Sequence, residues 1–382
     1  GAAAFFTGAL FAAGAGVFLG VAGAWASRNK GVTLRIVRIL RIFIFRHYTG
    51  LQMRHICLFA LFAYTMNGQT ARITVMATTD LHGHIYPYNY FTQKETNDGL
   101  AKIATLVAGV RKEVPNAILI DCGDTIQGSP LESVYQNFAL SGRLPAGVKV
   151  AQRLLAIDPM VLVMNAMKYD AMTVGNHEFN YGLQNLSSAR RVSRFAWLSA
   201  NTVASGPQSK SFVPYIEKTI DGVRIAIVGL TTPGIPQWEK PENYAGYSWE
   251  KPADALKRLM ELWGENKPDL IVVAAHGGID KTSDKENFAW QIAETPGISA
   301  VIFGHTHGEV AEVYNNDTLL VQPKNYGGSL ARLDFELKRN TAGKWELQGR
   351  RSKLLKVTPD VAANEEILAL AKPYHQAAEE YL

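Results

Sequence analysis

Five short apolar segments of this chain each run into polar residues that can bind a metal ion or transfer a proton. Residues 171–174 lead directly into Gly175-Asn176-His177-Glu178, which places an amide, an imidazole and a carboxylate in succession. Polar groups at the end of a buried strand lie at the rim of a sheet, where α/β enzymes keep their chemistry. A single triplet of this kind is more often a turn, so its weight depends on the other four segments.

The other four apolar segments end in aspartates and histidines. They cover residues 72–77, 117–120, 270–275 and 300–303. Together, the five exits supply seven candidate metal ligands: Asp80, His82, Asp124, Asn176, His276, His305 and His307. Five buried strands that release Asp, Asn or His at their ends are expected to converge on one site.

The seven candidates favour a pair of divalent metal ions. Carboxylates and imidazoles without thiolates suit Zn, Mn, Co or Fe better than a cysteine-rich structural zinc site. Seven ligands are too many for one ion but fit two, provided that one carboxylate bridges them. Asp80-x-His82 and His305-x-His307 would place alternate residues on the same side of an extended segment. Taken singly, each residue has an alternative structural reading, as a loop cap, an Asx-turn or a hydrogen-bonded histidine.

Helices are expected between these strands. Apolar residues at helical spacing predict helices from residue 98 to before Pro115 and over 149–156, 253–263 and 285–293. The first of these helices has Asp98 or Asn97 as its expected N-cap. Later apolar runs at 319–322, 330–337 and 345–347 predict strands of a second sheet. Strands that alternate with helices predict an α/β fold.

The order of the motifs resembles the calcineurin-like metallophosphoesterases, in particular their 5′-nucleotidase branch. The matching motifs lie between about residue 73 and about residue 335 and are Asp80-x-His82, Gly123-Asp124, Gly175-Asn176-His177-Glu178, His276 and Gly304-His305-x-His307. The resemblance implies a four-layer α/β/β/α sandwich with two divalent ions. It also implies the ligands of each ion: Asp80, His82, Asp124 and His307 for one, and Asp124, Asn176, His276 and His305 for the other. Asp124 would be the bridge.

The same resemblance gives His177 a catalytic role rather than a ligand role. The family's histidine at this position stabilises phosphoryl oxygens or protonates the leaving alkoxide, and Asn176 and His177 are expected to contact the substrate. Asn180 stands where the 5′-nucleotidase branch commonly has an aspartate that orients the histidine. An amide fixes the tautomer of an imidazole but cannot stabilise imidazolium with a full charge. Strong general-acid catalysis at neutral pH is therefore not expected.

Two longer motifs narrow the expected activity. Residues 123–131 and 175–183 resemble the bacterial 2′,3′-cyclic-nucleotide 2′-phosphodiesterase/3′-nucleotidases, which implies hydrolysis of nucleotide phosphoesters by a metal-activated water. The residues alone support phosphoester hydrolysis, and the nucleotide comes from the resemblance. The alternatives are a 5′-nucleotidase or UDP-sugar hydrolase, and a thiosulfohydrolase. A non-catalytic, membrane-tethered binding module is disfavoured, because a binder needs no bridging carboxylate.

The charge distribution argues against a nucleic-acid polymer as a partner. The chain has 382 residues and a formal net charge of +5. Residues 1–79 carry eight Lys and Arg and no Asp or Glu, which leaves 31 basic and 34 acidic residues for the remainder. The catalytic part therefore has a balance of −3 and no basic footprint for a polyanion.

The two ends of the chain suggest export and a missing partner domain. Residues 1–26 are uncharged and long enough to span a bilayer, and residues 53–70 have the layout of a signal peptide starting at Met53. We therefore expect residues 1–52 to be an upstream extension or a gene-boundary artefact, with a membrane anchor as the alternative. The enzyme would lie in the periplasm or outside the cell. The metallophosphoesterase domain is expected over 71–350, and 351–382 would be a linker and connecting helix without the nucleotide-recognition domain of relatives. The oligomeric state stays open.

Overall fold

The first of two large sheets carries the exits of the first three motif strands. The computed structural model describes residues 68–206, 210–281 and 285–382. In the first sheet the strand order is β16-β15-β1-β4-β5-β6. Strands β1, β4, β5 and β6 run parallel, while β15 and β16 are antiparallel additions at one edge. The bounds are β1 Thr70–Thr78, β4 Ile118–Asp121, β5 Ala171–Thr173, β6 Ala196–Leu198, β15 Ser329–Arg339 and β16 Trp345–Lys356.

The second sheet carries the exits of the last two motif strands. Its order is β13-β14-β12-β11-β9-β8, with β9, β11, β12 and β14 parallel and an antiparallel strand at each edge. The bounds are β8 Tyr215–Ile220, β9 Val223–Thr231, β11 Leu270–His276, β12 Ala300–Phe303, β13 Val310–Asn315 and β14 Thr318–Gln322. Two short ribbons pair β2 Tyr88–Asn89 with β3 Lys94–Glu95 and β7 Thr202–Ala204 with β10 Tyr247–Trp249.

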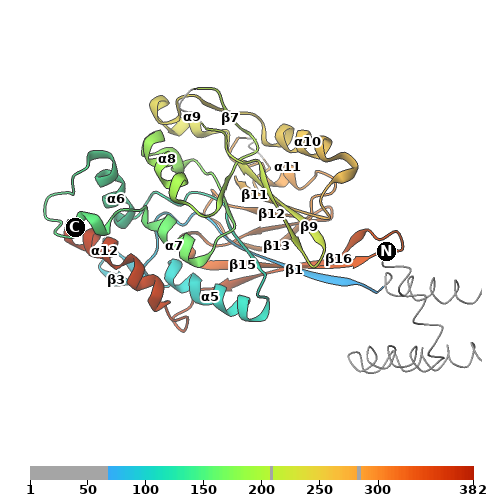
Figure 1. Cartoon of the computed structure of the whole chain (residues 1–382), viewed down its shortest axis with the longest axis horizontal. Helices are drawn as coiled ribbons and strands as arrows, with labels where there is room; N and C mark the ends of the chain where they lie inside the picture. Colours follow the sequence, from blue (N-terminus) through green and yellow to red (C-terminus); the bar gives the residue numbers. More distant parts are fainter. Residues whose placement is uncertain (1–67, 207–209, 282–284) are drawn as a thin grey trace, which may run out of the picture. The chain divides into compact units, whose positions relative to one another are not determined.

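Helices cover the outer face of each sheet, so the fold has four layers (Figure 1). The helices that share one apolar cluster with the outer face of the first sheet are α5 Leu100–Glu113, α6 Pro130–Ser141, α7 Pro159–Met167, α8 Gly182–Val192 and α12 Glu365–Tyr381. On the second sheet lie α10 Pro252–Trp263 and α11 Ala289–Ile292. The short α9 Ile235–Trp238 follows β9. The predicted α/β/β/α sandwich is confirmed.

Alternating apolar residues hold the two sheets face to face. On β1, Ile73, Val75 and Ala77 point into the core between the sheets, whereas Met76 points toward the helices. This alternation follows from the period of two along a strand. Each fully buried Ile or Val contributes roughly 1.5–3 kcal/mol of hydrophobic free energy, so the layer between the sheets is a major source of stability.

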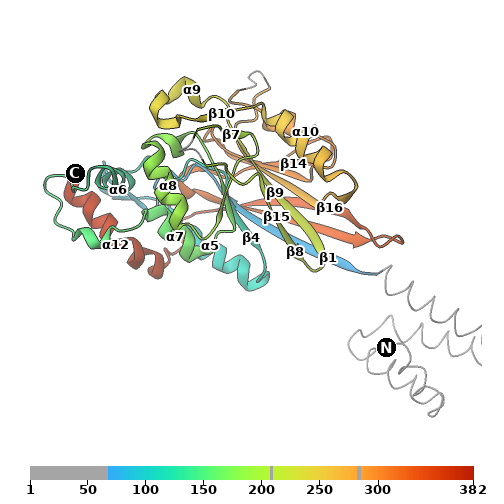
Figure 2. The same cartoon turned by 45° about the horizontal axis from the view of Figure 1, so that its top comes forward.

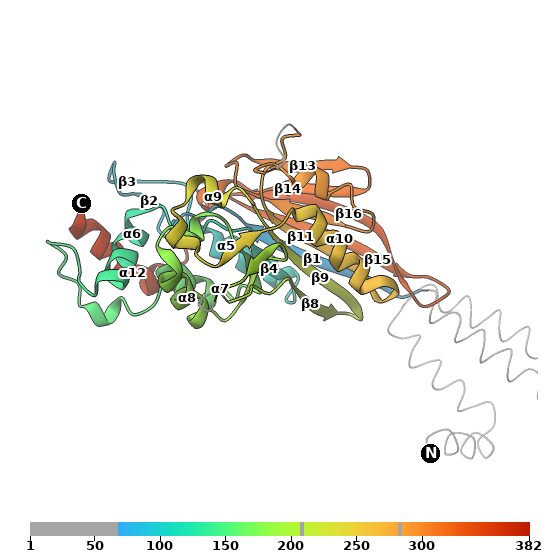
Figure 3. The same cartoon turned by 90° about the horizontal axis from the view of Figure 1, so that it is seen from above.

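The edges of the two sheets are also joined by polar contacts. Strands β13 and β16 lie side by side (Figure 3). The hydroxyl of Ser352 donates to the carbonyl of Ala311 at 2.5 Å, and the Ser352 amide donates to Glu312 Oε2 at 2.9 Å. Lys356 and Glu309 form an ion pair at 3.2 Å. These contacts tie the first sheet to the second along one side.

Several local expectations differ from the structure. The late strands form no sheet of their own: β14 joins the second sheet, while β15 pairs with β1 in the first. The helix expected over 149–156 is only a 3₁₀ turn at Gln152–Leu154, and α11 is shorter than expected. Helix α5 has Gly99 as its N-cap, without a side-chain hydrogen bond. Asp98 instead accepts a hydrogen bond from the Thr96 hydroxyl at 2.6 Å.

The C-terminal helix packs into the same unit as the sheets. Residues 68–382 form one compact unit, and the expected boundary at residue 350 falls inside β16. Helix α12 lies beside α6 and α7 (Figure 2), and its Ala371, Tyr374 and Ala377 are buried. The expected extension over 1–52 and residues 53–67 of the expected signal peptide over 53–70 lie outside the described residues, and Thr70 at the end of that segment already belongs to β1. Within the described ranges, no helix combines the length and the apolar character needed to cross a membrane.

A buried carboxyl group on α6 has an oxygen without a donor. Glu132 is fully buried, and its Oε1 accepts a hydrogen bond from Gln136 at 2.6 Å. Its Oε2 has no hydrogen-bond partner among the described residues. Burial raises the pKa of Glu132 well above its ordinary value, and the neighbouring charge of Asp158 raises it further. Glu132 therefore keeps its proton to a higher pH than a glutamate in water does.

We predict that Glu132→Gln makes the protein less sensitive to alkaline pH. The folded pKa of Glu132 lies above the unfolded one, so its favourable contribution is complete below about pH 4.3 and is lost as the pH rises toward the folded pKa. Glutamine has the shape of the protonated group and no proton to lose. In urea unfolding, the variant should match the parent near pH 4, and its excess in unfolding free energy should grow by about 1.4 kcal/mol per pH unit from about pH 4.3 up to the folded pKa. Identical pH dependence in both proteins would contradict the protonated state.

Candidate active site

All seven predicted ligands lie at the carboxyl ends of parallel strands, and both sheets contribute. The first sheet supplies those after β1, β4 and β5, and the second supplies those at the ends of β11 and β12. In chain order they are Asp80 and His82, Asp124, Asn176, His276, and His305 with His307. The facing sheets bring these exits together because their inner faces pack on one another. The predicted convergence is therefore present in the geometry.

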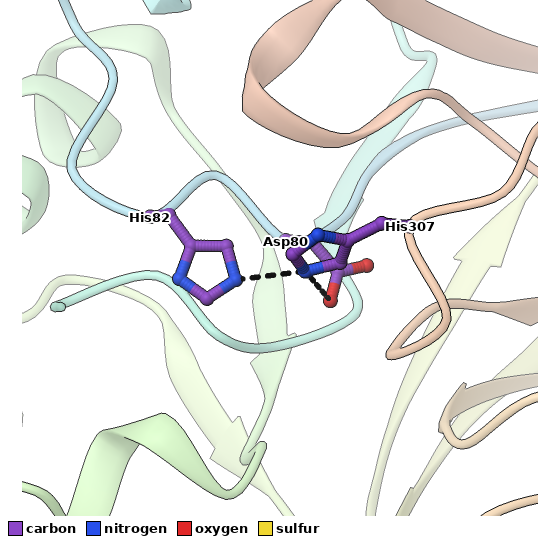
Figure 4. A group of neighbouring side chains, drawn as sticks. All are labelled: Asp80, His82 and His307. Carbon is purple, nitrogen blue, oxygen red and sulfur yellow. Dashed lines mark hydrogen bonds and ion pairs between the residues drawn. The ribbon is translucent and has the colours of Figure 1, made fainter. Parts of the chain in front are cut away.

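One group of side chains combines Asp80, His82 and His307 (Figure 4). The Nε2 atoms of His82 and His307 are 3.0 Å apart, and His307 Nε2 is 3.7 Å from Asp80 Oδ1. His82 Nδ1 lies 3.0 Å from the carbonyl oxygen of Gln127, which can only accept. The proton of His82 therefore belongs on Nδ1, and Nε2 offers its lone pair to the group, as a metal-ligating histidine does.

A second group combines Asp124, His276 and His305, with the amide of Asn176 beside it. His276 Nδ1 is 2.8 Å from the carbonyl oxygen of Cys122, so this nitrogen donates. His276 Nε2 faces Asp124 Oδ2 at 3.0 Å and Asn176 Oδ1 at 3.1 Å. Two oxygens and a nitrogen thus point at one place, and such a cluster of electron-rich atoms needs a proton or a cation between them.

Asp124 reaches both groups. Its ligand oxygen also lies within 4.8 Å of the nearest ligand nitrogens of His82 and His177. Burial alone would raise the pKa of Asp124, but His276, His177 and His82 hold it well below the usual range of a carboxyl group. The carboxylate is therefore ionised at any physiological pH and lies where a bridge between two cations would have to be.

The surrounding histidines differ in charge. Burial lowers the pKa of His82 to about 4, and burial together with the charge of His276 lowers the pKa of His305 to about 4. Both rings are neutral at pH 7 and have a free lone pair. Burial would also lower the pKa of His276, but the charge of Asp124 raises it to about 10. Burial and the charge of Asp124 raise the pKa of Asp80 to about 7, although His276 opposes the shift. His82, His305 and Asp124 are thus already in the protonation state that a divalent cation needs, whereas His276 and Asp80 would lose a proton when a cation binds.

The backbone of the exits is turned rather than extended. Five of the seven predicted ligands have left-handed backbone conformations, with φ of 49° at Asp80, 47° at His82, 59° at Asp124, 72° at His305 and 53° at His307. The Asp-x-His and His-x-His pairs therefore converge through turns, and the expectation of extended segments is wrong. Left-handed conformations cost roughly 1–2 kcal/mol per non-glycine residue, and clusters of them are typical of functional sites.

Glycines allow the exits to approach each other. A Cβ atom on Gly175 would lie 2.3 Å from Asp124 Oδ1 and 2.9 Å from the His276 ring. A Cβ atom on Gly304 would lie 2.0 Å from the Thr79 hydroxyl oxygen and 2.7 Å from Asp80 Oδ2. These distances are shorter than any real contact of a Cβ atom, so only glycine fits at positions 175 and 304.

Glu178 fixes the position of Asp124 through hydrogen bonds to backbone amides. Its buried carboxylate accepts hydrogen bonds from the backbone amides of Asp124 at 2.9 Å, Thr125 at 2.6 Å and Gly175 at 2.7 Å. Burial and the charge of Asp124 raise the pKa of Glu178, whereas these hydrogen bonds oppose the rise. These contacts join the β4 exit to the β5 exit and hold the backbone of the candidate ligand Asp124 in place.

His177 lies at the open side of the site. Its side chain is 35% exposed, and its Nε2 is 4.0 Å from Asp124 Oδ2. Its backbone amide donates to Asp124 Oδ1 at 2.8 Å. Asn180, three residues later, places its Oδ1 2.6 Å from His177 Nδ1. The ring is therefore held from behind by Asn180 and can face a molecule bound over the two groups.

Three further residues border the site and were not found in the sequence. The Tyr326 ring stacks on His84 at 4.2 Å and meets His82 edge-on at 5.7 Å. The Trp238 ring lies 5.4 Å from that of His305. Glu239 accepts a hydrogen bond from the Asn180 amide. Tyr326 lies in the 3₁₀ turn Asn325–Gly327, Trp238 ends α9, and Glu239 follows it directly. These segments carry no motif, so no signal in the sequence marks the three residues.

The tyrosines that follow His84 pack away from the candidate ligands. Tyr86 stacks on His375 of α12 at 4.0 Å, and its hydroxyl donates to the Leu368 carbonyl at 2.5 Å. The Tyr90 hydroxyl is 2.8 Å from His375 Nδ1. These contacts explain the aromatic loop as packing against α12.

Comparisons with known proteins agree with the fold and with the order of the motifs. The family model of the calcineurin-like phosphoesterases matches residues 73–309. The chain is 31% identical to the trifunctional nucleotide phosphoesterase protein YfkN of Bacillus subtilis over 338 residues, which are 81% of this chain and 22% of that protein. It is 28% identical over 355 residues to the 2′,3′-cyclic-nucleotide 2′-phosphodiesterase/3′-nucleotidase of Salmonella typhimurium, covering 84% of this chain and 53% of the relative.

A solved structure gives the same result. The crystal structure of the calcineurin-like phosphoesterase YfkN from Bacillus subtilis matches with a TM-score of 0.71 and 28% identity, over 82% of this chain and 99% of the other. The chain spans only part of the two curated relatives, namely 22% of the Bacillus subtilis protein and 53% of the Salmonella typhimurium protein. From the match over residues 73–309 and the fold they adopt, the chain belongs to the calcineurin-like phosphoesterase family.

Proposed function

We propose that this chain hydrolyses nucleotide phosphoesters with two divalent metal ions, and that its substrates are 2′,3′-cyclic nucleotides and 3′-nucleotides. The observation that carries the proposal is the position of Asp124, whose carboxylate belongs to the group with His276 and His305 and lies within 4.8 Å of the ligand nitrogen of His82 from the other group. The choice of nucleotide is supported by the relatives named for these activities. The 5′-nucleotidases and the UDP-sugar hydrolases remain the alternative.

The proposed ligands follow the two groups. One ion would be held by Asp80, His82, Asp124 and His307, and the other by Asp124, Asn176, His276 and His305. The site thereby offers oxygen and nitrogen donors without sulfur among these residues, which suits Zn, Mn, Co or Fe. When bound, two such ions would polarise the phosphate, lower the pKa of an attacking water and offset the charge that develops during in-line attack.

The residues of the chain orient the substrate and the proton transfer. The backbone amide of His177 holds Asp124 in place, and the His177 ring faces the open side of the site. A phosphoryl oxygen or the leaving alkoxide would receive a hydrogen bond from His177 Nε2 when the ring is protonated. Asn176 and His177 would contact the phosphoryl group together, and Asn180 would keep the ring in place.

Export completes the proposal. The signal-peptide pattern over residues 53–70 and the apolar segment over 1–26 support a location in the periplasm or outside the cell, with a membrane tether as the alternative. The substrate would then be a small nucleotide rather than a polymer, in agreement with the acidic balance after residue 79.

We predict that Asp124→Asn removes both the activity and at least one metal ion. An amide cannot bridge two cations with a full negative charge, so hydrolysis of 2′,3′-cyclic AMP should fall by about 100-fold or more. The number of metal ions per chain, measured by mass spectrometry after gel filtration, should drop from two to one or none. Asp317→Asn, the same change at an exposed loop position, should retain both ions and the activity. Two tightly bound ions and normal turnover in Asp124→Asn would refute the bridge.

We also predict the outcome of one experiment that tests both the metal dependence of the activity and the choice of nucleotide. The full chain is stripped with a chelator and then restored with Zn, Mn or Co. Hydrolysis of 2′,3′-cyclic AMP and 3′-AMP should disappear on stripping and return with metal, while 5′-AMP should be hydrolysed at least about 10-fold more slowly. Faster hydrolysis of 5′-AMP would favour the 5′-nucleotidase alternative. Two bound ions without hydrolysis of any of the three would leave the binding module as the better hypothesis.

A further inference from the structure

The side chain of Asn180 lies between the ring of His177 and a carboxylate, that of Glu239. His177 Nδ1 is 2.6 Å from Asn180 Oδ1, and Asn180 Nδ2 donates to Glu239 Oε2. His177 and Asn180 lie after β5 of the first sheet, in and directly after the 3₁₀ turn His177–Phe179. Glu239 follows α9, in the segment after β9 of the second sheet. The three side chains form a line that crosses from one sheet to the other.

The carboxylate determines which way the amide of Asn180 points. A glutamate carboxylate only accepts hydrogen bonds, so the NH₂ group of Asn180 must face Glu239. The carbonyl oxygen of Asn180 must then face His177, and this oxygen also only accepts. The proton of the neutral ring is therefore fixed on Nδ1, and Nε2 is left free on the side of the candidate metal ligands.

Glu239 is itself held in place by two further donors. Its Oε1 accepts from the Lys240 backbone amide at 2.7 Å and from Asn243 Nδ2 at 2.9 Å. Asn243 Nδ2 also donates to the backbone carbonyl of Asn180 at 3.1 Å. Both oxygens of Glu239 thus have donors, and Asn243 links Glu239 to the backbone of Asn180. A side chain fixed at both ends can fix its neighbour.

We infer that Glu239 is a positioning residue for His177 and acts through the amide of Asn180. The inference rests on the proposed function, in which Nε2 of His177 faces the substrate. It also accounts for the asparagine at position 180, where the related branch commonly has an aspartate. The negative charge is still present in this chain, but it stands on Glu239, and the amide of Asn180 conveys its orientation to the ring.

Exchanging the amide and the carboxylate tests this assignment. In Glu239→Gln, the new amide both donates and accepts, so Asn180 can turn over and offer NH₂ to His177 Nδ1. This selects the tautomer with its proton on Nε2 and leaves the Nδ1–H of the protonated ring without an acceptor. In Asn180→Asp, two carboxylates face each other and repel. Each single variant should lower kcat for 2′,3′-cyclic AMP by about 10-fold or more, with a smaller change in KM. In Asn180→Asp with Glu239→Gln, the carboxylate accepts from both neighbours, and kcat should return to within about 3-fold of the parent.

A spectroscopic measurement separates the inference from the proposed function. The full chain, loaded with Zn and labelled with ¹⁵N-histidine, reports which ring nitrogen of each histidine carries the proton, and His177→Ala identifies the signals of His177. The parent and the double variant should have the Nδ1–H form, and Glu239→Gln should contain the Nε2–H form. If the parent hydrolyses no nucleotide, the proposed function fails, while the tautomer of His177 still decides the inference.

Glu242→Gln provides the matched control. Glu242 is an exposed carboxylate three residues after Glu239, so the same chemical change there should leave both kcat and the His177 tautomer unchanged. The inference is overturned if Glu239→Gln retains the Nδ1–H form and the parent kcat. It is also overturned if the double variant is no better than the weaker single variant, because the order of amide and carboxylate would then not matter.

Discussion

The ion pair between Asp124 and His276 joins the two sheets at the site, and the other contacts of the site are arranged around it. Asp124 follows β4 of the first sheet and His276 ends β11 of the second, with 3.0 Å between Oδ2 and Nε2. Both side chains are buried. Removing one partner of such a pair typically costs about 3–5 kcal/mol because an uncompensated charge stays buried. The same two groups are proposed metal ligands, so the chemistry and the contact between the sheets depend on one interaction.

This arrangement requires backbone conformations that are unfavourable elsewhere. The left-handed turns at Asp80 and Asp124 oppose folding, and they persist because surrounding contacts determine them. Glu178 makes the clearest such contacts, because its carboxylate accepts hydrogen bonds from the backbone amides of Asp124, Thr125 and Gly175. A site of this kind is expected to give up stability for function. The strain is concentrated where the proposed ions would bind, and bound cations would relieve part of the repulsion among the acceptor atoms.

The sequence predicted the elements of the site better than their arrangement. Apolar runs and the polar residues after them are local patterns, so the exits at Asp80, Asp124 and His276 could be placed correctly. The partner of β1 could not, because β15 is far away in the chain and pairing depends on packing between distant segments. Residues 149–156 have a helical pattern but form only a 3₁₀ turn. Glu239 escaped detection because its role exists only once the two sheets face each other.

Because β1 pairs with β15, the first sheet stays incomplete until late in the synthesis of the chain. Thr74 on β1 donates to Asp334 on β15, a residue 260 positions later. At synthesis rates of roughly 5–20 residues per second, β15 follows β1 after about 10–50 s. During that time one edge of β1 has no partner strand, and an unpaired edge invites pairing with other chains. A nascent copy of this domain therefore exposes one edge of β1 to pairing with other chains until β15 has been synthesised.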